Sequence, residues 1–373
     1  MWHPQFQFPE YLKRASTEDC VAYFEKGFVL QHVMIQRIHN ELKSGFFEST
    51  EQQVALVVGP TGVGKSCLAH AIFKESYQDA PEGEFLRELP MIYFEADVHS
   101  TGGFSWKDFY TRLLRAIGEL EDIRVYGKPV AVGDSGARTY SSRSRTEHDL
   151  RKDLEQRIKD YGVKYILFDE IQHVFKYGGK AAERNLDILK NISNKTACRF
   201  IGLGTYEVSF SVEKSAQLSR RMMTLEFPGY SIDKKAEFQQ FLSAYSGLLA
   251  HMPVKISPKV AAYSKEVYVG CCGCIGILKE WLNRALRRAL NEQCELSVSH
   301  LGGTRLRGSQ LKSIAEEIRE GKAFFVEPED DEIMALLGVG VFKQAKPEVA
   351  SDKAPVRKKA QPGVRKPSRD VVN

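Results

Sequence analysis

The chain has 373 residues, of which 43% are hydrophobic and 27% charged, and its formal net charge is +5 at pH 7. This composition is typical of a globular protein with more than one domain, and it excludes a collagen-like or wholly disordered chain. No segment approaches the roughly 18 apolar residues that cross a bilayer, so we expect no membrane span. The first residues show no basic and then apolar leader, and we therefore expect a cytoplasmic protein with reduced cysteines.

The basic charge is concentrated near the C-terminus. Residues 343–373 contain nine Lys or Arg and three Asp or Glu, so the rest of the chain is close to neutral. Prolines lie among these charges at positions 347, 355, 362 and 367. A segment with this composition buries too little apolar surface to fold, so we expect a largely disordered basic tail over residues 326–373.

Short apolar runs recur through the first two thirds of the chain. They predict strands buried on both faces, at residues 53–58, 91–96, 164–168 and 199–203, with a further strand-like run at 223–227. Helical patterns lie between them at 105–120 and 146–162, and each opens with a Ser or Thr followed by Asp three residues later. Strands that alternate with helices predict a parallel α/β sheet flanked by helices.

Beyond residue 229 the periodicity is helical only. Apolar residues recur on one face through 238–249 and 277–289, which predicts a small all-α lid domain. An N-terminal arm with aromatic residues and a helical pattern precedes the first strand. We therefore divide the chain into an N-terminal arm, an α/β domain, a helical lid and the tail, at residues 1–50, 51–229, 230–325 and 326–373.

A glycine-rich motif follows the first predicted strand. Residues 59–66 read Gly-Pro-Thr-Gly-Val-Gly-Lys-Ser and match G-x-x-x-x-G-K-[ST] in full, so a glycine turn matched by chance is the weaker interpretation. The glycines let backbone N–H groups wrap phosphates, and the next helix adds positive charge at its N-terminus. We expect Lys65 at the β- and γ-phosphates and Ser66 at Mg²⁺. The motif predicts an ATP site formed by Gly59, Pro60, Thr61, Gly62, Val63, Gly64, Lys65, Ser66 and Cys67.

Two acids end the third predicted strand. Asp169 and Glu170 follow four apolar residues, and ligands of an open α/β sheet bind at the carboxyl ends of its strands. We expect Asp169 to hold Mg²⁺, directly or through water, and Glu170 to polarise a water in line with the γ-phosphate. The alternative is a strand that ends in two solvated acids, and the phosphate loop makes it the weaker one.

Two further positions suit a nucleoside triphosphatase. Thr205 follows the fourth predicted strand and brings a hydroxyl beside the expected γ-phosphate, with a helix-cap or turn hydroxyl as the alternative. Arg220 and Arg221 precede the last strand-like run. They suit an arginine finger that reaches the nucleotide of a neighbouring subunit, and a solvated basic pair is the alternative.

The order of these motifs resembles that of the TniB/TnsC family of AAA+ ATPases, which regulate DNA transposition in bacterial cut-and-paste elements. The resemblance covers residues 29–290 and rests on the segments 167–173, 185–190, 201–205, 217–220 and 273–278. All AAA+ proteins share the nucleotide-site motifs. The succession of D-E-I-x-H, L-x-x-L-K, G-x-G-T and Q-L-x-R is more specific to this family.

The resemblance implies an AAA+ P-loop fold with a helical lid, and ATP-dependent assembly of the homo-oligomer into rings or helical filaments on double-stranded DNA. It implies transposase subunits and a target-selecting protein of the TniQ/TnsD type as partners, and a nucleoid-associated location. Carried over by position, it implies Walker A residues Lys65 and Ser66, Walker B residues Asp169 and Glu170, sensor-1 Thr205 and arginine finger Arg220, with Arg221 as its substitute.

One position departs from the AAA+ pattern. Many AAA+ proteins carry a sensor-2 arginine in a G-x-x-R motif of the lid, and Gly276 occupies that slot here. Either Lys279, one turn later, serves instead, or the lid senses the nucleotide weakly. Weak sensing is consistent with slow hydrolysis and a persistent ATP-bound state.

Candidate DNA contacts lie in two polar segments. One contains Arg138, Arg143 and Arg145 among Ser and Thr, and the other brings Thr101 near Lys107. Phosphate contacts dominate DNA affinity without reading sequence, so we expect these residues to line a DNA channel. A mobile surface loop is an interpretation of comparable weight. The composition of the tail suits both non-specific DNA binding and a flexible link to the transposase.

Two other functions are alternatives. A replication initiator or helicase loader would normally carry a winged-helix domain after the lid, and the residues that follow Leu290 show no such pattern. A nucleotide-switched signalling ATPase without DNA binding would carry fused repeat or effector domains, for which this sequence shows no pattern. Electron microscopy with duplex DNA would separate these alternatives from a transposition regulator.

Overall fold

The computed structural model describes residues 8–49, 52–77, 89–96, 104–126, 146–175, 179–209 and 222–338. The chain forms two compact units, Met1–Val326 and Glu327–Asn373. In the second unit the described part contains one short helix, α16 (Asp330–Leu336). None of the described helices combines the length and the apolar character needed to cross a membrane.

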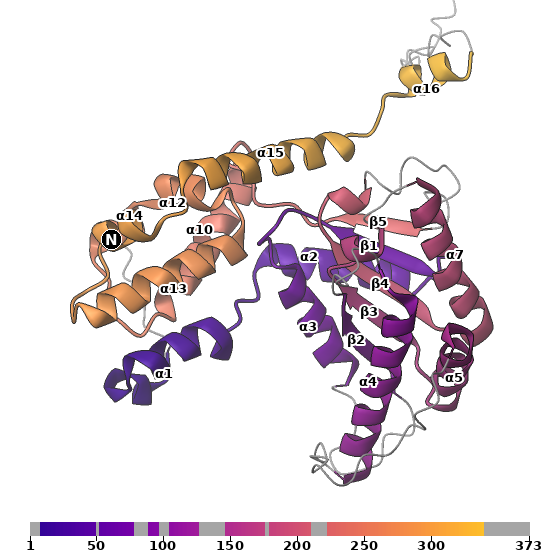
Figure 1. Ribbon diagram of the computed structural model, residues 1–373. Coiled ribbons are helices and arrows are strands. Elements are labelled where there is room, and N and C mark those ends of the chain that lie inside the picture. The colour runs from indigo at the N-terminus through magenta and orange to yellow at the C-terminus, as the bar shows by residue number, and fades with distance from the viewer. Residues whose placement is uncertain are drawn as a thin grey trace, which may run out of the picture. The chain divides into compact units, whose positions relative to one another are not determined.

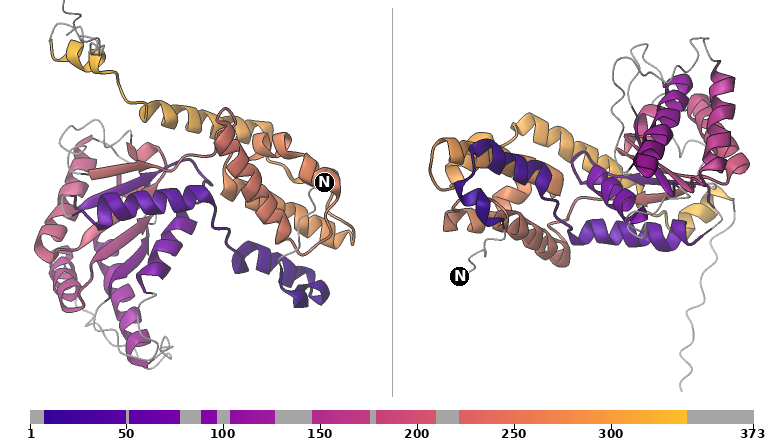
Figure 2. Two further views of the ribbon diagram at one scale, coloured as in Figure 1. Left: turned by 180° about the vertical axis from the view of Figure 1, so that it is seen from behind. Right: turned by 90° about the horizontal axis from the view of Figure 1, so that it is seen from below.

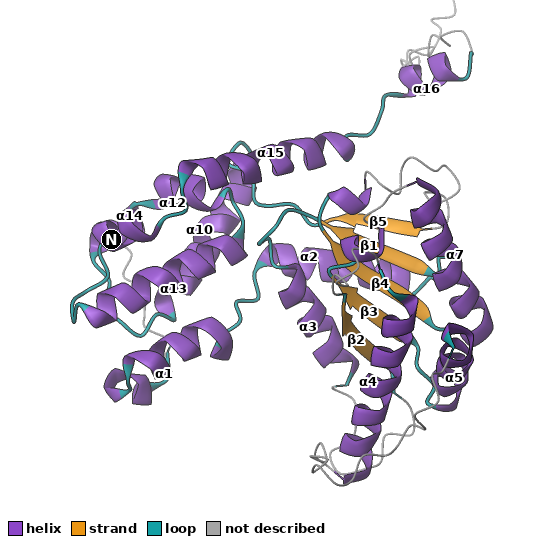
Figure 3. Cartoon of the chain, in the orientation of Figure 1, coloured by secondary structure: helices purple, strands orange, loops and turns teal. Residues whose placement is uncertain are grey.

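A parallel sheet lies at the centre of the first unit (Figure 3). Its strands are β1 (Val54–Val58), β2 (Met91–Glu95), β3 (Tyr165–Asp169), β4 (Arg199–Gly204) and β5 (Met222–Glu226). They lie in the order β2-β3-β4-β1-β5, and each of the described pairings is parallel. The predicted parallel α/β sheet is confirmed, and each strand begins within a residue of its predicted apolar run.

Helices cover both faces of this sheet, because side chains of β1 alternate between the faces. Val54, Leu56 and Val58 belong to an apolar cluster with residues of α4, α5 and α7, whereas Ala55 and Val57 pack with residues of α2 and α3. In Figure 1, α4 and α7 lie on the near side of the sheet, and α2 lies in front of it in the left view of Figure 2. These helices are α2 (Val33–Leu42), α3 (Lys65–Ser76), α4 (Trp106–Tyr126), α5 (Glu147–Asp160) and α7 (Gly179–Thr196).

The predicted helix boundaries have local causes. The Thr146 side chain accepts the Asp149 N–H at 3.2 Å, and the Asp149 carboxylate accepts the Thr146 N–H at 3.3 Å, which is a complete capping box at the start of α5. Gly162 follows that helix with φ of +60°, a conformation that glycine adopts without strain. Ser105 caps α4 by accepting the Asp108 N–H at 3.2 Å.

A group of helices follows β5. Its members are α10 (Lys235–Ala250), α11 (Pro258–Ala262), α12 (Ser264–Cys271), α13 (Ile275–Asn291), α14 (Val298–Thr304) and α15 (Gly308–Phe324). The buried Trp281 of α13 donates its indole N–H to the Leu301 carbonyl at 2.9 Å, which ties α13 to α14. The predicted helical region is therefore confirmed.

The segment before β1 packs on these helices as well as on the sheet. It contains η1 (Glu10–Arg14), α1 (Thr17–Ala22), η2 (Tyr23–Gly27), α2 and η3 (Lys43–Phe47). Lys279 of α13 donates to the Glu25 and Phe28 carbonyls at 2.9 and 2.6 Å. The predicted N-terminal arm thus leads into the sheet and also accepts hydrogen bonds from α13.

Candidate nucleotide site

The glycine-rich motif forms the turn from β1 into α3. Gly62 and Gly64 have φ of +72° and +119°, which L side chains rarely adopt. Gly59 approaches the backbone of Phe227 so closely that a Cβ there would lie 2.1 Å from the Phe227 carbonyl oxygen. The glycines are therefore required by both the curvature and the packing of the loop, and α3 begins at Lys65, directly behind it.

Lys65 is buried against the loop that it follows. Its ammonium donates to the carbonyl oxygens of Gly59 at 3.0 Å and Pro60 at 2.9 Å, and only 7% of the residue is exposed. Burial lowers the pKa of this lysine, and the charges of Glu170, Glu317 and Asp169 act in the opposite direction. A buried cation whose described hydrogen bonds go only to neutral carbonyls at a phosphate-binding loop is suited to holding an anion at the mouth of that loop.

Asp169 and Glu170 end β3. Asp169 is 2% exposed, and its two carboxylate oxygens accept the Glu170 N–H at 3.0 Å and the Tyr93 hydroxyl at 3.1 Å. Burial and the neighbouring Asp169 raise the pKa of Tyr93, so its hydroxyl keeps the proton that it donates. Glu170 has φ of +55°, a strain of about 1–3 kcal/mol for a side chain that is not glycine.

Gln172 joins the second acid to the end of β4. It is the first residue of α6 (Gln172–Phe175), and its side-chain amide donates to the Glu170 carboxylate while its side-chain carbonyl accepts the Thr205 N–H at 3.4 Å. The hydroxyl oxygen of Thr205 is buried and has no hydrogen-bond partner among the described residues. A buried hydroxyl without a partner beside the phosphate loop is available to a ligand.

Sequence reasoning missed Gln172. The signal for it is weak, because a glutamine two positions after a carboxylate has many possible partners until the strand order is known. In the structure β3 and β4 are neighbours, and Gly204 lies so close that a Cβ there would be 3.0 Å from the Gln172 amide oxygen. Because the two strand ends are adjacent, Gln172 bonds to both Glu170 and Thr205.

Helix α13 meets the phosphate loop backbone to backbone. The Ile277 N–H donates to the Gly62 carbonyl at 3.2 Å, and a Cβ on Gly276 would lie 2.4 Å from that same oxygen. A side chain at position 276 would therefore clash with the backbone of the phosphate loop as it lies in this structure. Lys279 instead bonds to the N-terminal segment, and burial lowers its pKa.

A residue from α15 also reaches the loop. The Thr61 N–H donates to the Glu317 carboxylate at 3.3 Å, although the two residues are 256 positions apart. Burial raises the pKa of Glu317, and the Thr61 bond and the charge of Lys65 act against that rise. Sequence reasoning missed this residue, since nothing in the pattern of α15 points to the loop.

Most of the predicted DNA-contacting and finger residues lie outside the described residues. They are Thr101, Arg138, Arg143, Arg145, Arg220 and Arg221. Lys107 is exposed in the first turn of α4. The assignments of these residues therefore stay predictions, as do the functional roles of the loop residues, of Asp169 and Glu170, and of Thr205.

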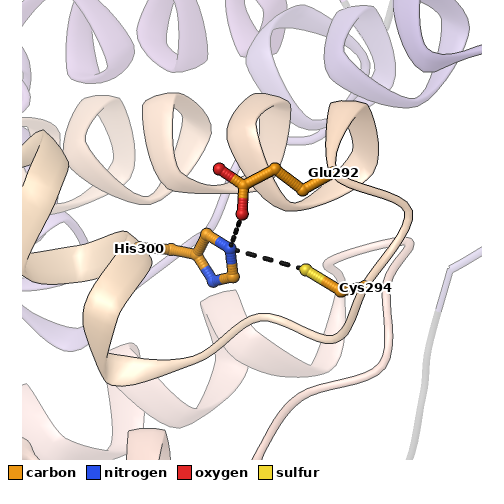
Figure 4. Close-up of side chains that lie close together, drawn as sticks. All are labelled: Glu292, Cys294 and His300. Carbon is orange, nitrogen blue, oxygen red and sulfur yellow. Dashed lines mark hydrogen bonds and ion pairs between the residues drawn. The ribbon is translucent and has the colours of Figure 1, made fainter.

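A second cluster of polar side chains lies between α13 and α14 (Figure 4). His300 Nε2 is 3.0 Å from the Glu292 carboxylate and 3.5 Å from the Cys294 sulfur. The Ser297 N–H donates to His300 Nδ1 at 3.0 Å, so in the neutral ring the proton lies on Nε2. A metal would need the Nε2 lone pair, and the cluster is therefore better explained as a cap of α14.

Comparison with known proteins gives a match to one family model and to several solved structures. Residues 48–210 match the sequence model of a family described as AAA domain. The chain is similar in structure to the ORC2 protein of Aeropyrum pernix in its ADP form, with 17% identity over 75% of this chain and 70% of that chain and a TM-score of 0.49. It is also similar to a Walker-type ATPase of Pyrococcus abyssi, with 13% identity over 84% of this chain and 77% of that chain and a TM-score of 0.48.

A third similar structure is Drosophila ORC bound to DNA, with 13% identity over 91% of this chain and 86% of that chain and a TM-score of 0.49. The search of curated proteins found no match. The AAA-domain match, the parallel sheet and the complete phosphate loop together identify an AAA+ P-loop fold with a helical C-terminal region.

Proposed function

We propose that this protein binds ATP with Mg²⁺ at the loop between β1 and α3 and hydrolyses it. One observation carries the proposal: a complete phosphate loop follows β1, which adjoins β4, and the Thr205 hydroxyl after β4 has no partner among the residues that the structure describes. Strand β4 in turn adjoins β3, which ends at Asp169 and is followed by Glu170. The carboxyl ends of adjacent parallel strands form one edge, where ligands of α/β sheets bind. The AAA-domain match over residues 48–210 supports the same reaction.

The proposed roles follow from the chemistry of each group. Backbone N–H groups of residues 61–67 would surround the phosphates, and Lys65 would exchange its bonds to loop carbonyls for phosphate oxygens. Glu170 would orient and polarise the attacking water, and Thr205 would donate its hydroxyl to the γ-phosphate. Arg220 would complete the site of a neighbouring subunit, with Arg221 as its substitute.

The residues present suit Mg²⁺. The ion prefers oxygen ligands, and Asp169 is a buried carboxylate whose oxygens each accept one described hydrogen bond and retain further acceptor capacity. Ser66 is exposed in the first turn of α3 and offers a hydroxyl. When bound, the ion would neutralise phosphate charge, and Asp169 and Ser66 are the residues that would hold it.

We further propose that the ATPase regulates DNA transposition, as the TniB/TnsC resemblance implies. The succession of segments at residues 167–173, 185–190, 201–205 and 217–220 supports this role. On this proposal the protein assembles on double-stranded DNA in the nucleoid as a ring or helical filament, and it links a TniQ/TnsD-type target selector to the transposase. The proposed domains are the arm, the α/β domain, the lid and the tail, at 1–50, 51–229, 230–325 and 326–373.

Thr101, Lys107, Arg138, Arg143 and Arg145 are the proposed DNA contacts. Lysine and arginine contribute to DNA affinity by releasing counterions, so their loss should lower both the affinity and its salt dependence. The test is duplex-DNA binding by a triple alanine variant at the three arginines over a range of salt concentrations. Unchanged affinity and an unchanged salt slope would remove this segment from the proposed DNA channel.

The function is tested in two steps. Calorimetric titration with ATP and Mg²⁺ should show binding by the natural protein and little or none by Lys65→Ala, whose circular dichroism should be unchanged. Electron microscopy with duplex DNA and a non-hydrolysable ATP analogue should then show rings or filaments threaded by DNA. Assembly that does not depend on DNA would favour a signalling ATPase. Absence of nucleotide binding would exclude the proposed ATPase function.

A further inference from the structure

Helix α15 carries a carboxylate to the mouth of the phosphate loop. It runs from the helical group toward the sheet (Figures 1 and 2), and Glu317 Oε1 accepts the Thr61 N–H at 3.3 Å. The charges of Glu317 and Lys65 also interact, since each alters the pKa of the other. A half-buried carboxylate thus bonds to a backbone N–H of the loop that the motif normally offers to phosphate, and its charge acts on the loop lysine without a direct bond to it.

The helix is held in this position by contacts on its next turns. Gly321 is buried against Tyr206, so that a Cβ at position 321 would lie 2.2 Å from the tyrosine ring. The Phe325 ring lies near the same tyrosine in a tilted arrangement, with ring centroids 6.2 Å apart. The Tyr206 hydroxyl donates to the Glu226 carboxylate of β5 at 2.7 Å, which fixes the ring that α15 packs on.

These contacts place α15 across two parts of the proposed nucleotide site. Glu317 lies at the loop that would bind phosphates, and Tyr206 directly follows Thr205 at the end of β4. The small size of Gly321 permits the close approach, because any side chain there would displace the helix or the ring. The surface on which α15 packs therefore adjoins the site that would bind a triphosphate.

We infer that Glu317 is an internal anionic ligand of the phosphate loop, which competes with nucleotide phosphates and makes docked α15 an autoinhibitory element. The inference rests on the proposed ATP site. Phosphates that enter the loop bring negative charge beside Glu317, and the two anions repel each other while competing for the Thr61 N–H and Lys65. Nucleotide binding therefore requires Glu317 to leave the loop, and the docked helix lowers the affinity of the nucleotide-free protein.

The first experiment compares Glu317→Gln with Glu316→Gln as its matched control. Glu316 lies one position earlier on the same helix and pairs with Lys312 at 3.8 Å. Glutamine at 317 keeps the oxygen that accepts the Thr61 N–H and removes only the charge. We expect Glu317→Gln to bind ADP and a non-hydrolysable ATP analogue about tenfold more tightly than the natural protein. Glu316→Gln should bind both as the natural protein does.

A second variant undocks the helix without changing any charge. Gly321→Leu places a side chain where Tyr206 lies, so we expect faster amide hydrogen exchange through residues 308–324 and tighter nucleotide binding. In the natural protein the ATP analogue should accelerate exchange in the same segment, because its phosphates displace Glu317.

The possible outcomes separate the two proposals. If the natural protein binds nucleotide and neither variant binds it more tightly, the autoinhibitory role is wrong while the ATP site stands. Weaker nucleotide binding by Glu317→Gln would show that Glu317 favours nucleotide binding, and it would also overturn the inference. If the natural protein and both variants all fail to bind nucleotide, the proposed function itself fails and the inference fails with it.

Discussion

Gly276 and Gly62 touch through their backbones, since a Cβ on Gly276 would lie 2.4 Å from the Gly62 carbonyl oxygen. This contact joins the first turn of α13 to the phosphate loop, and the Ile277 N–H donates to the same oxygen at 3.2 Å. In this structure the helical region after β5 meets the loop without a side chain from position 276. Position 276 therefore serves the packing of α13 on the loop in this structure.

Replacing Gly276 should weaken the fold and the loop together. Gly276→Ala forces its Cβ against a backbone carbonyl, and overpacking of this kind destabilises a protein by about 1–3 kcal/mol. Urea unfolding measures the loss. Gly118→Ala is the control, because no described atom beyond its own stretch of helix lies within 4 Å of its added Cβ and alanine favours the helix interior of α4. Equal stability of the two variants would contradict the close contact.

Removing the charge of Glu170 should separate ATP binding from ATP turnover. Glu170→Gln keeps the size of the side chain and loses the carboxylate that we propose as the base that polarises water, so we expect hydrolysis to slow about a hundredfold or more while ATP binding is retained. The nucleotide-bound assembly should also persist longer. Steady-state phosphate release and calorimetry measure the two effects, with the exposed Glu147→Gln as control. Turnover at the natural rate would show that the base is another residue.

The buried hydroxyl of Thr205 distinguishes a ligand-binding role from a structural one. Thr205→Val keeps the shape and removes an oxygen that has no partner among the described residues, so the free energy of unfolding should stay equal or rise slightly. Turnover should fall at least about tenfold, since the hydroxyl would no longer reach the γ-phosphate. Ser209→Ala is the control, because Ser209 is also buried and its hydroxyl has no partner within the described part of the chain, but it follows Thr205 by four positions. A stability loss with normal turnover would assign Thr205 to the fold alone.

Acid should destabilise the protein through His32. Its Nδ1 lies 2.9 Å from the Tyr230 hydroxyl, and burial lowers its pKa from 6.5 to about 4. Between these two values the unfolded chain binds a proton that the folded protein does not, so stability falls as the pH drops through this window. The loss approaches about 3 kcal/mol near pH 4.

Urea unfolding at pH 7, 5.5 and 4.5 measures this dependence. His32→Gln should flatten the slope between these pH values, because glutamine does not titrate. The exposed His148→Gln serves as control and should leave the slope as it is in the natural protein. Parallel curves for the natural protein and His32→Gln would contradict the role of His32.

The local features of the site could be predicted from the sequence because each depends on neighbouring residues. The phosphate loop requires glycines at positions with positive φ, and Gly62 and Gly64 have φ of +72° and +119°. The capping box of Thr146 and the stop at Gly162 are equally local. Alternation of buried strands and helices was enough to predict the parallel sheet, since only that arrangement buries both faces of each strand.

The contacts that complete the site depend on strand order and on the path of the chain between elements. Gln172 bridges Glu170 and Thr205 only because β3 and β4 are adjacent. Glu317 reaches Thr61 across 256 positions, and no periodicity within α15 encodes that distance. The strands, the helix caps and the phosphate loop could be predicted from the sequence alone, because local backbone sterics and burial act within a few residues. Only tertiary packing decided that Glu317 lies at the loop, because this contact depends on the positions of helices that are far apart in the sequence.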